Sequence, residues 1–508
     1  YFLDADNVTF NASGKQGTVT VDATGVKPDN MYVTAGDYTF EGGAITATGD
    51  ITISGGKATF DTDFGATTVT VGSAATLGVT NPHTLTGDLN ASGATLNFTA
   101  PLNAPSGTKI LSVTGNATIP NTSVNVAIPG TASPLQIGDF LVLIDAAGSL
   151  VGKPLTTVAS ALGMQGVTID YEFALSTTAK QLIATLQESP AANPQSKSLS
   201  EGFVSGVAVI TETSDFTANE GMSAAVDAVG HDTTAIDYKA FGAVGGGNIR
   251  YNTGSHVDLK SFSAVAGIAK GFSLKKSYLT LGAFFEYGSG SYDTYNSFSG
   301  VAFHGDGDIT HIGGGILGKA EFNRTDRGQG YFEGSVRAGE VKNTYTNKDM
   351  NVGGVNASYK AKSSYAGFHL GTGYIFAVNP KADLDLYTKY YFTRQGKDDV
   401  TLTTGDPIHF DAVKSSRVRV GARLSGKGKV VSPYIGAAIE REFDGQAKAT
   451  AFGLPIDAPS LKGNTGIGEL GLTLRPAKAP GLSINLGLQG YVGKREGVSG
   501  SFRLRYEF

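Results

Sequence analysis

The sequence predicts an all-β protein in three parts: an N-terminal β-solenoid resembling a right-handed β-helix, a short α-helical linker, and a C-terminal antiparallel transmembrane β-barrel of about twelve strands. Residues 497–508 (GVSGSFRLRYEF) alternate apolar and charged side chains, which predicts a strand with one apolar face. Segments of the same kind recur back to about residue 233, and short Thr-rich stretches come before them. These features are typical of strands that close into a barrel in lipid, preceded by a separate β-rich part.

Composition excludes several classes of protein. Glycine accounts for 70 of 508 residues and charged residues for 17%, a balance that favours strands and tight turns over helices. A net charge of −5 provides no basic field, so nucleic acid is not expected as a partner. The absence of cysteine excludes disulfides and thiolate metal sites. No apolar run approaches the ~18 residues of a membrane-spanning helix. Tyr1 begins no secretory signal, so an exported protein would be a mature or truncated form here.

Residues 1–188 are assigned to the solenoid. Short β-prone stretches such as 17–21 (GTVTV), 50–53 (DITI) and 67–71 (TTVTV) are separated by turn residues and show no helical period. Their spacing is loose, on the order of twenty residues per coil. A Thr-rich sandwich is the alternative for residues 1–130, and the sequence does not separate the two.

A denser apolar block follows, from about residue 138 to 188. It contains GDFLVLIDAAGSLVG and a predicted hairpin over 167–186, with a turn near Ser176 to Ala179. A solenoid end exposes an unpaired strand edge, so we interpret this block as the cap of the solenoid.

Residues 189–232 are assigned to a linker and a helix. Two prolines mark 188–198 as the linker proper. Ser198 and Glu201 then have capping-box spacing, which predicts a helix start. A second short helix is expected from Thr217 to Gly230. The first helix presents a narrow apolar stripe formed by Leu199, Phe203, Val207 and Ile210.

Residues 233–508 are assigned to the barrel. Val418, Val420 and Leu424, for example, alternate with arginines, so one face would meet lipid and the other an aqueous or ion-paired lumen. The lumen set either grips the linker helix and closes the pore or forms a solvated wall whose charges pair across strands. The charges predicted to face the lumen are Asp383, Asp385, Lys389, Arg417, Arg419, Arg423, Glu440, Glu442, Glu469, Arg503, Arg505 and Glu507.

The terminal strand carries a further signal. Phe502, Leu504, Tyr506 and Phe508 alternate up to an aromatic last residue, and this pattern resembles the C-terminal assembly signal of outer-membrane barrels. With the helical segment and the β-rich part before it, the chain resembles the monomeric autotransporters of type V secretion. That resemblance implies a monomer in the outer membrane, with lipid, the barrel assembly machinery and periplasmic chaperones as partners. It also implies a passenger displayed on the cell surface, where a host or neighbouring-cell ligand would bind it.

Candidate chemical sites are few. His304, Asp306, Asp308 and His311 (HGDGDITH) suggest a metal site, but an EF-hand starting at Asp306 would need a carboxylate near residue 317, which is leucine, so a polar loop is favoured. The glycine clusters 245–247 and 313–315 lack the features of a phosphate loop and are interpreted as small residues facing a lumen helix.

A catalytic function is not expected from these residues. His83 is the only histidine before the linker and sits in a turn-like stretch, so a Ser-His-Asp site is disfavoured and no cofactor is expected. Some autotransporters cut off their passenger at paired asparagines, whereas Asn193 and Asn219 are isolated here, so the passenger is expected to stay attached. Surface display for adhesion is the favoured function. The alternatives are an enzymatic passenger (protease or esterase) lying upstream of Tyr1 and a porin-like channel.

Overall fold

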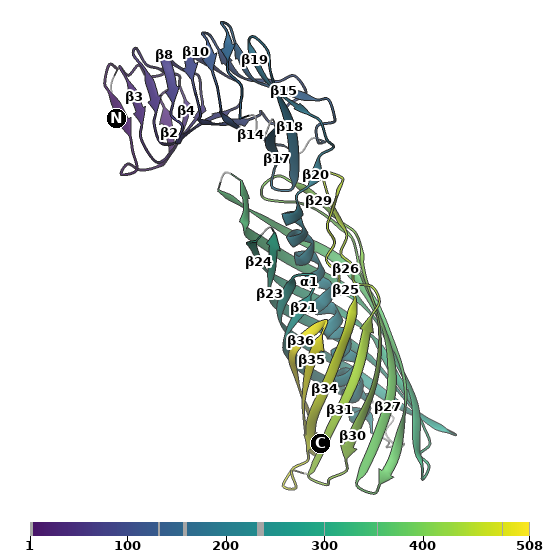
Figure 1. Ribbon diagram of the computed structural model, residues 1–508. Coiled ribbons are helices and arrows are strands. Elements are labelled where there is room, and N and C mark those ends of the chain that lie inside the picture. The colour runs from purple at the N-terminus through teal and green to yellow at the C-terminus, as the bar shows by residue number, and fades with distance from the viewer. Residues whose placement is uncertain are drawn as a thin grey trace. The chain divides into compact units, whose positions relative to one another are not determined.

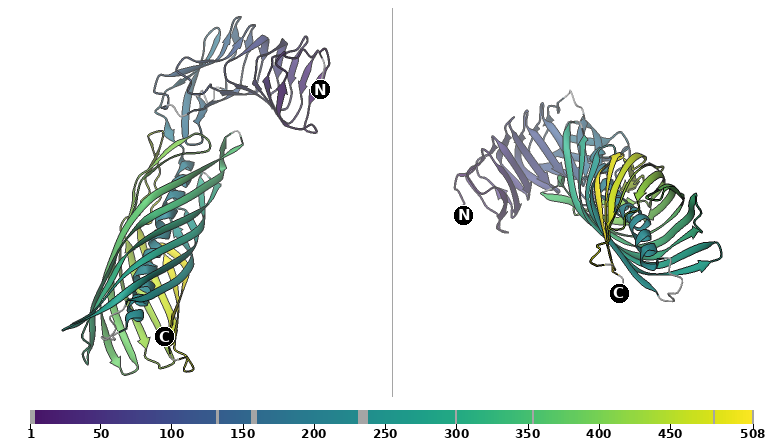
Figure 2. Two further views of the ribbon diagram at one scale, coloured as in Figure 1. Left: turned by 180° about the vertical axis from the view of Figure 1, so that it is seen from behind. Right: turned by 90° about the horizontal axis from the view of Figure 1, so that it is seen from below.

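The computed structural model describes residues 4–130, 133–155, 160–230, 238–298, 300–352, 354–479 and 481–506. Its contacts divide the chain into two units, one of Tyr1–Asn193 with Gly405–Pro407 and one of Pro194–Thr404 with Ile408–Phe508. Figures 1 and 2 show the strands of the first unit and the barrel of the second, and each unit is described by itself.

The described part of the first unit holds twenty strands, β1 to β20, joined in one hydrogen-bonded sheet. Most neighbouring strands run parallel and are separated by about one turn of chain, so each strand pairs with the next strand on the same side of the unit. The strands are β1 (Val8–Phe10), β2 (Gly17–Val21), β3 (Met31–Val33), β4 (Asp37–Gly42), β5 (Ile45–Thr46), β6 (Ile51–Ile53), β7 (Gly56–Asp61), β8 (Phe64–Val71), β9 (Ala75–Thr80), β10 (His83–Asn90), β11 (Thr95–Thr99), β12 (Lys109–Val113), β13 (Ala117–Thr118), β14 (Ser123–Ile128), β15 (Phe140–Ala146), β16 (Leu150–Val151), β17 (Ser160–Gln165), β18 (Ile169–Thr177), β19 (Gln181–Leu186) and β20 (Ala191–Ala192).

The core of this unit is built from in-register apolar side chains. Val19, Phe40, Phe60, Val79 and Phe98 are paired in succession along β2, β4, β7, β9 and β11, at intervals of 21, 20, 19 and 19 residues. The last four are almost fully buried, and the Phe40 and Phe60 rings stack with their centroids 5.2 Å apart. Since alternate residues of a strand point to opposite sides, the residues between them, many of them threonines, face outward.

Pairing changes from parallel to antiparallel at the end of the first unit. β17 pairs with β18, β18 with β19 and β15 with β19, all antiparallel. The hairpin expected over 167–186 is present as β18 and β19, closed by a bond from the Thr178 N–H to the Gln181 carbonyl. Lys109 Nζ lies 2.6 Å from Asp145 Oδ2 and ties β12 to β15. This hydrogen bond lowers the pKa of the Asp145 carboxyl.

The second unit contains a closed barrel of twelve strands, which confirms the predicted strand count and antiparallel pairing. The first seven strands reach 25 residues, more than twice the ~10 residues needed to cross a bilayer. The barrel strands are β21 (Lys239–Asn252), β22 (His256–Leu274), β23 (Ser277–Phe298), β24 (Val301–Phe322), β25 (Gly328–Val352), β26 (Val355–Asn379), β27 (Ala382–Gln395), β30 (Val413–Gly426), β31 (Val431–Glu442), β34 (Gly463–Leu474), β35 (Leu482–Gly493) and β36 (Arg495–Tyr506).

The two rims of the barrel differ. The rim reached by the connections 396–412 and 443–462 carries a further four-stranded sheet of β28 (Asp398–Thr401), β29 (Pro407–Phe410), β32 (Ala449–Ala451) and β33 (Leu454–Ile456). We call it the outer rim, because the extracellular connections of such barrels are the longer ones. The opposite, inner rim has shorter connections, and β36 ends there at Tyr506. Phe502 and Leu504 point outward, exposed by 42% and 57%, whereas Glu507 and Phe508 lie outside the described residues.

A helix lies inside the barrel (Figure 1). α1 (Lys197–Phe216) follows a single 3₁₀ turn, η2 (Pro194–Ser196), and continues without a break through η3, a π-helical turn (Thr217–Gly221), into α2 (Met222–Val229). We call Lys197–Val229 the plug helix. Within the described residues no helix is long and apolar enough to span a membrane.

Two expectations about this helix were wrong. Thr217 does not start a second helix, because its backbone is helical, at φ −63° and ψ −44°. Ser198 and Glu201 form no capping box: the Ser198 hydroxyl bonds to the Gln195 carbonyl, and the Glu201 carboxylate is bound by the barrel wall. In both cases contacts with the surrounding wall replace local signals that would fix the ends of a solvent-exposed helix.

Candidate functional site

The candidate site is the barrel lumen with the plug helix inside it. Leu199, Phe203, Val207 and Ile210, the predicted apolar stripe, are fully buried. Ser198, Ser200 and Glu201, on other sides of the helix, are also fully buried. The helix is therefore enclosed on all sides, and each of its polar groups must find a partner on the wall.

Polar and aromatic groups hold the helix near the outer rim. Glu201 accepts hydrogen bonds from Ser255 (2.6 Å), Thr253 (2.8 Å) and the Asn296 amide. The Phe203 ring stacks on Phe410 of β29, with centroids 4.4 Å apart and planes 2° from parallel. The loop sheet at this rim therefore contacts the helix directly.

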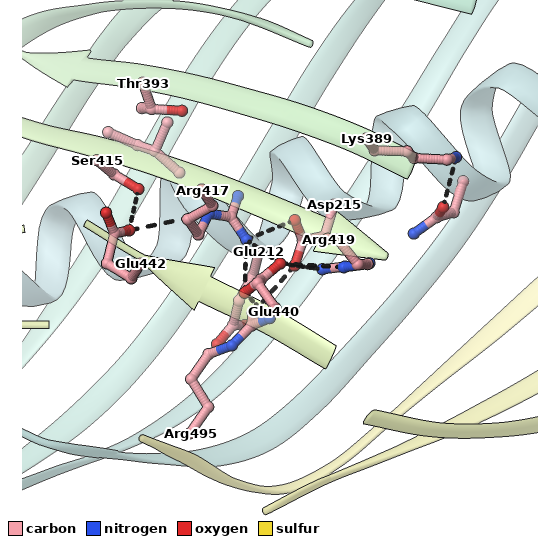
Figure 3. A network of polar contacts seen from close by, with 12 residues as sticks. Glu212, Asp215, Lys389, Thr393, Ser415, Arg417, Arg419, Glu440, Glu442 and Arg495 are labelled. Carbon is pink, nitrogen blue, oxygen red and sulfur yellow. Dashed lines mark hydrogen bonds and ion pairs between the residues drawn. The ribbon is translucent and has the colours of Figure 1, made fainter. Parts of the chain in front are cut away.

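A charged cluster holds the middle of the helix (Figure 3). Asp215 lies 2.7 Å from both Arg417 and Arg419 and 3.0 Å from Arg495. Glu440 of β31 pairs with the same three guanidinium groups, at 2.6 to 3.2 Å. We call these five residues the ion cluster. Two carboxylates and three guanidiniums share the buried space, so a single positive charge remains, and helix residue Asp215 supplies half of the negative charge.

A second ionic group lies on the other side of the helix. The Arg337 guanidinium donates to the Ile210 carbonyl at 2.7 Å and to Glu286 at 3.0 Å. The Tyr365 hydroxyl also donates to Glu286. The carbonyl of Ile210 is thus bonded by the wall even though it lies within the helix, a contact that depends on backbone position and not on side-chain type.

Other contacts continue along the helix. Glu212 accepts bonds from the Tyr251 hydroxyl (2.9 Å) and from the Ser261 hydroxyl. Thr213 lies 2.8 Å from the His311 ring nitrogen Nε2. Lys389 Nζ donates to the Ala218 carbonyl (3.0 Å), so the π-helical turn is bound by the wall at this point.

The inner end of the helix is apolar. Met222, Ala225 and Val229 pack against Phe241 and Val265, with further barrel residues completing a buried cluster. Arg503 bridges the edge of this region by pairing with Glu220 and Asp227, both at 3.2 Å. The plug helix is consequently fixed by polar contacts near the outer rim, by charge in the middle and by apolar packing at the inner end.

Small residues let helix and wall approach closely. A Cβ on Gly202 would lie 2.6 Å from the Tyr345 ring and the Tyr359 hydroxyl. On the wall, a Cβ on Gly245 would meet the Phe216 ring at 2.7 Å. Gly245 therefore faces the helix as expected, whereas Gly313 and Gly315 face the wall side chains Tyr365 and Phe284, a correction to the predicted role of the cluster 313–315.

The predicted lumen charges divide by partner. Arg417, Arg419, Lys389 and Arg503 contact the plug helix, and Glu440 reaches it through the arginines. The two readings of the lumen set thus apply to different residues.

The remaining predicted charges pair within the wall. Arg423 forms a two-bonded pair with Glu469, both bonds 2.7 Å. Asp385 accepts the Tyr331 hydroxyl, and Glu442 accepts the Ser415 hydroxyl. Asp383 pairs with Arg324 and Lys427 towards the inner rim, Arg505 lies half-buried on the same face of β36 as Arg503, and Glu507 is outside the described residues.

The sequence interpretation missed the acidic side of the helix and several wall partners. An amphipathic pattern directs attention to apolar positions, but the signal was present in the charges: residues 197–230 carry one lysine against five carboxylates, opposite a wall rich in arginine. The missed residues are Glu201, Glu212, Asp215, Glu220, Glu286, Arg337 and Arg495.

The HGDGDITH residues do not come together. They lie on β24, where Asp306 and Asp308 are exposed on the outer face, His304 pairs with Asp349, and His311 points into the lumen. Alternating sides of one strand separate these side chains. Within the described ranges no group of three metal-ligating side chains is found.

The geometry defines a class: an outer-membrane type of β-barrel whose lumen is occupied by a helix from the same chain. A family model described as the autotransporter beta-domain matches residues 240–489. These residues belong to that family, and the chain is an autotransporter with its barrel at the C-terminal end, in the outer membrane.

Solved structures give a consistent but weaker picture. The beta domain of Bordetella BrkA is 15% identical, over 53% of this chain and 99% of that chain, with a TM-score of 0.41. The translocator domain of NalP from Neisseria meningitidis is 13% identical, over 59% and 97%, with a TM-score of 0.43. The transport unit of AIDA-I from Escherichia coli is 16% identical, over 58% and 99%, with a TM-score of 0.42. No curated protein matches the chain.

Replacing Asp215 by asparagine tests the ion cluster. Asp215→Asn would leave three buried guanidinium groups facing Glu440 alone, and breaking one partner of a buried pair costs about 3 kcal/mol or more. We expect a lower melting temperature and more frequent open-pore currents in planar bilayers. Asp227→Asn is the matched control on the same helix, because Asp227 is 57% exposed and a screened pair contributes little. Equal currents from the two variants would contradict a gripping role for Asp215.

Replacing Gly202 by alanine tests the close approach of helix and wall. In an isolated helix alanine is favoured over glycine by about 0.5–1 kcal/mol, but here its Cβ would overlap two tyrosines. We expect Gly202→Ala to destabilise the seated helix by about 1–3 kcal/mol, measured as increased hydrogen exchange of residues 198–206. Gly221→Ala is the control, since its Cβ would meet Val265 at an ordinary 3.5 Å. Faster exchange in Gly221→Ala alone would show that propensity, not fit, governs the helix.

Proposed function

We propose that the barrel enables export of the N-terminal unit, that this unit is a β-solenoid passenger displayed on the cell surface, and that the plug helix closes the pore afterwards. The observation that carries the proposal is the seated helix itself. Its polar and charged groups are matched to the wall along its whole length, as expected of a resident segment and not of a transient occupant.

The direction of the helix supports display. Its first turn lies at the outer rim, where the Ser198 hydroxyl is bonded by the Asn347 amide and the Leu199 carbonyl by Tyr359. Its last turn lies at the inner rim, beside Tyr278 at the start of β23. A chain that enters the lumen from the outer rim has its preceding residues on that side of the membrane, which would place the N-terminal unit outside the cell.

The strand pairing supports the solenoid. Successive parallel pairs at intervals of 19 to 21 residues favour a coil that repeats at this spacing, over a sandwich whose neighbours would run mainly antiparallel. The antiparallel strands β15 and β17 to β20 would then close its end. Outward-facing threonine and asparagine side chains offer a polar binding surface, so adhesion to a host or neighbouring-cell ligand is the proposed role of the passenger.

We propose that this part of the chain has no catalytic role. Both ring nitrogens of His83 face carboxylates, Asp61 at 3.2 Å and Asp63 at 3.3 Å. A histidine bound on both sides has no free nitrogen to activate a nucleophile, which disfavours the Ser-His-Asp alternative. A solute channel is disfavoured as well, because the seated helix occupies the lumen.

The proposed partners follow from the location. Lipid would contact the outward apolar band, and the assembly machinery and chaperones would read the strand that carries Phe502 and Leu504. We propose a monomer, since the barrel closes on itself by the pairing of β21 with β36.

Protease shaving of intact cells tests surface display. One tag is placed before Tyr1 and a second in the inner-rim turn at Lys275 and Lys276. We expect loss of the first tag and survival of a membrane fragment carrying the second, because only the outer side is accessible. Cells with a permeabilised outer membrane are the control and should lose both. A first tag that is protected until permeabilisation would mean that the N-terminal unit faces the periplasm.

A further inference from the structure

Five exposed cations lie on the outer wall of the barrel, close to the outer rim. They come from four neighbouring strands, β25, β26, β27 and β30 (Figure 1). Their sequence neighbours are buried towards the lumen, Val341 by 99% for example, so the cations point away from it. We call them the cation belt: Lys342, Lys360, Lys362, Arg394 and Lys414.

The strand register sets like charges opposite one another. Lys342 is paired with Lys362 across β25 and β26, and Arg394 with Lys414 across β27 and β30. Like charges directly opposite on one face destabilise a sheet unless something neutralises them. The belt contains two such pairs side by side along the wall.

Neighbouring acids offset only part of this charge. Glu340 lies between the first pair, 3.7 Å from Lys342 Nζ and 2.9 Å from Lys362 Nζ. The Asp398 carboxylate accepts the backbone N–H of Lys362 at 2.6 Å. The pair of Arg394 and Lys414 faces no acid in its own register. A net positive strip therefore remains on an otherwise acidic protein.

The belt borders the apolar band of the barrel. On the side towards the inner rim, the next outward residues include an aromatic group in which Phe368 lies 5.8 Å from Tyr390 and 5.6 Å from Phe392. Beyond it, Leu370 and Val420 are exposed by 60% and 58%. Exposed aliphatic side chains bounded by aromatic ones mark the edge of the hydrocarbon region in such barrels.

We propose that the cation belt binds the phosphate-bearing headgroup of a lipid in the outer leaflet. The height of the belt, just above the aromatic edge, is where lipid phosphates lie when the acyl chains cover the apolar band. Arg394 can bind a phosphate through two N–H donors, while the lysines act as point charges. The headgroup would supply the anions that the two like-charged pairs lack, so lipid binding and barrel stability are coupled.

Lipid titration of the purified full-length chain in detergent tests the proposal. The probes are bisphosphorylated lipid A and the same lipid after dephosphorylation, and the readouts are the melting temperature and the apparent affinity. We expect the phosphorylated lipid to raise the melting temperature of the wild type, with an effect that weakens as salt increases. The dephosphorylated lipid should have a much smaller effect.

Two charge-neutralising variants locate the binding. Lys342→Gln, Lys362→Gln, Arg394→Gln and Lys414→Gln combined should weaken binding of the phosphorylated lipid at least about tenfold. The control, Lys275→Gln with Lys276→Gln, removes exposed lysines at the inner rim and should bind as the wild type does. The two wild-type titrations decide the question even if the fourfold variant does not fold.

Three results would overturn the assignment. Equal affinity for the phosphorylated and dephosphorylated lipids would show that acyl contacts alone are responsible. Equal affinity of the wild type and the fourfold variant would place the lipid elsewhere. Binding of soluble inositol hexakisphosphate as tightly as lipid A would assign the belt to a soluble polyanion and not to the membrane.

Discussion

The seating of the plug helix depends on matching charge inside a barrel. A lumen wall facing water or a peptide segment carries polar side chains, and once a helix fills it those side chains are cut off from bulk solvent. The ion cluster resolves this: Asp215 contributes the carboxylate that Arg417, Arg419 and Arg495 lack when Glu440 alone faces them. Without the helix the cluster carries two uncompensated positive charges, and with it, one. The position of the helix along the barrel is therefore set by where its acids lie.

Different interactions act at the two ends of the helix. Near the outer rim, hydrogen bonds to Glu201 and the stacking of Phe203 on Phe410 connect the helix to the loop sheet. At the inner end, Met222 and Val229 pack into an apolar cluster. Apolar packing tolerates small shifts, whereas paired charges and backbone contacts such as that of Arg337 with the Ile210 carbonyl do not. The middle of the helix thus defines its register, and the ends add stability.

Strand alternation made the barrel predictable. Val418, Val420 and the arginines between them could be assigned to opposite faces from the sequence, because a period of two fixes which side a residue faces once the strand exists. The parallel pairs of the N-terminal unit were less predictable, since their spacing drifts between 19 and 21 residues and gives no repeated motif. Partners across the lumen could not be predicted at all. Which arginine meets Asp215 depends on the rotation and depth of the helix, and both are tertiary properties.

The helix ends illustrate the same limit. Ser198 and Glu201 have the spacing of a capping box, and in water they would be expected to form one, but the wall offers Glu201 three better donors. Thr217 similarly resembles a helix start, yet the helix passes through it because the wall binds the Ala218 carbonyl. Local signals assume a helix surrounded by solvent, and burial inside a barrel replaces that environment with fixed partners.

The central claim is that a direct charge interaction between helix and wall holds the plug in place. A double-mutant cycle between Asp215→Asn and Arg419→Gln measures it, with single-channel open probability in planar bilayers reporting the equilibrium between seated and displaced helix. We predict a coupling free energy of about 1–3 kcal/mol between the two sites. Effects of the two substitutions that add to within about 0.5 kcal/mol would contradict the claim and leave packing, not charge, as the force that seats the helix.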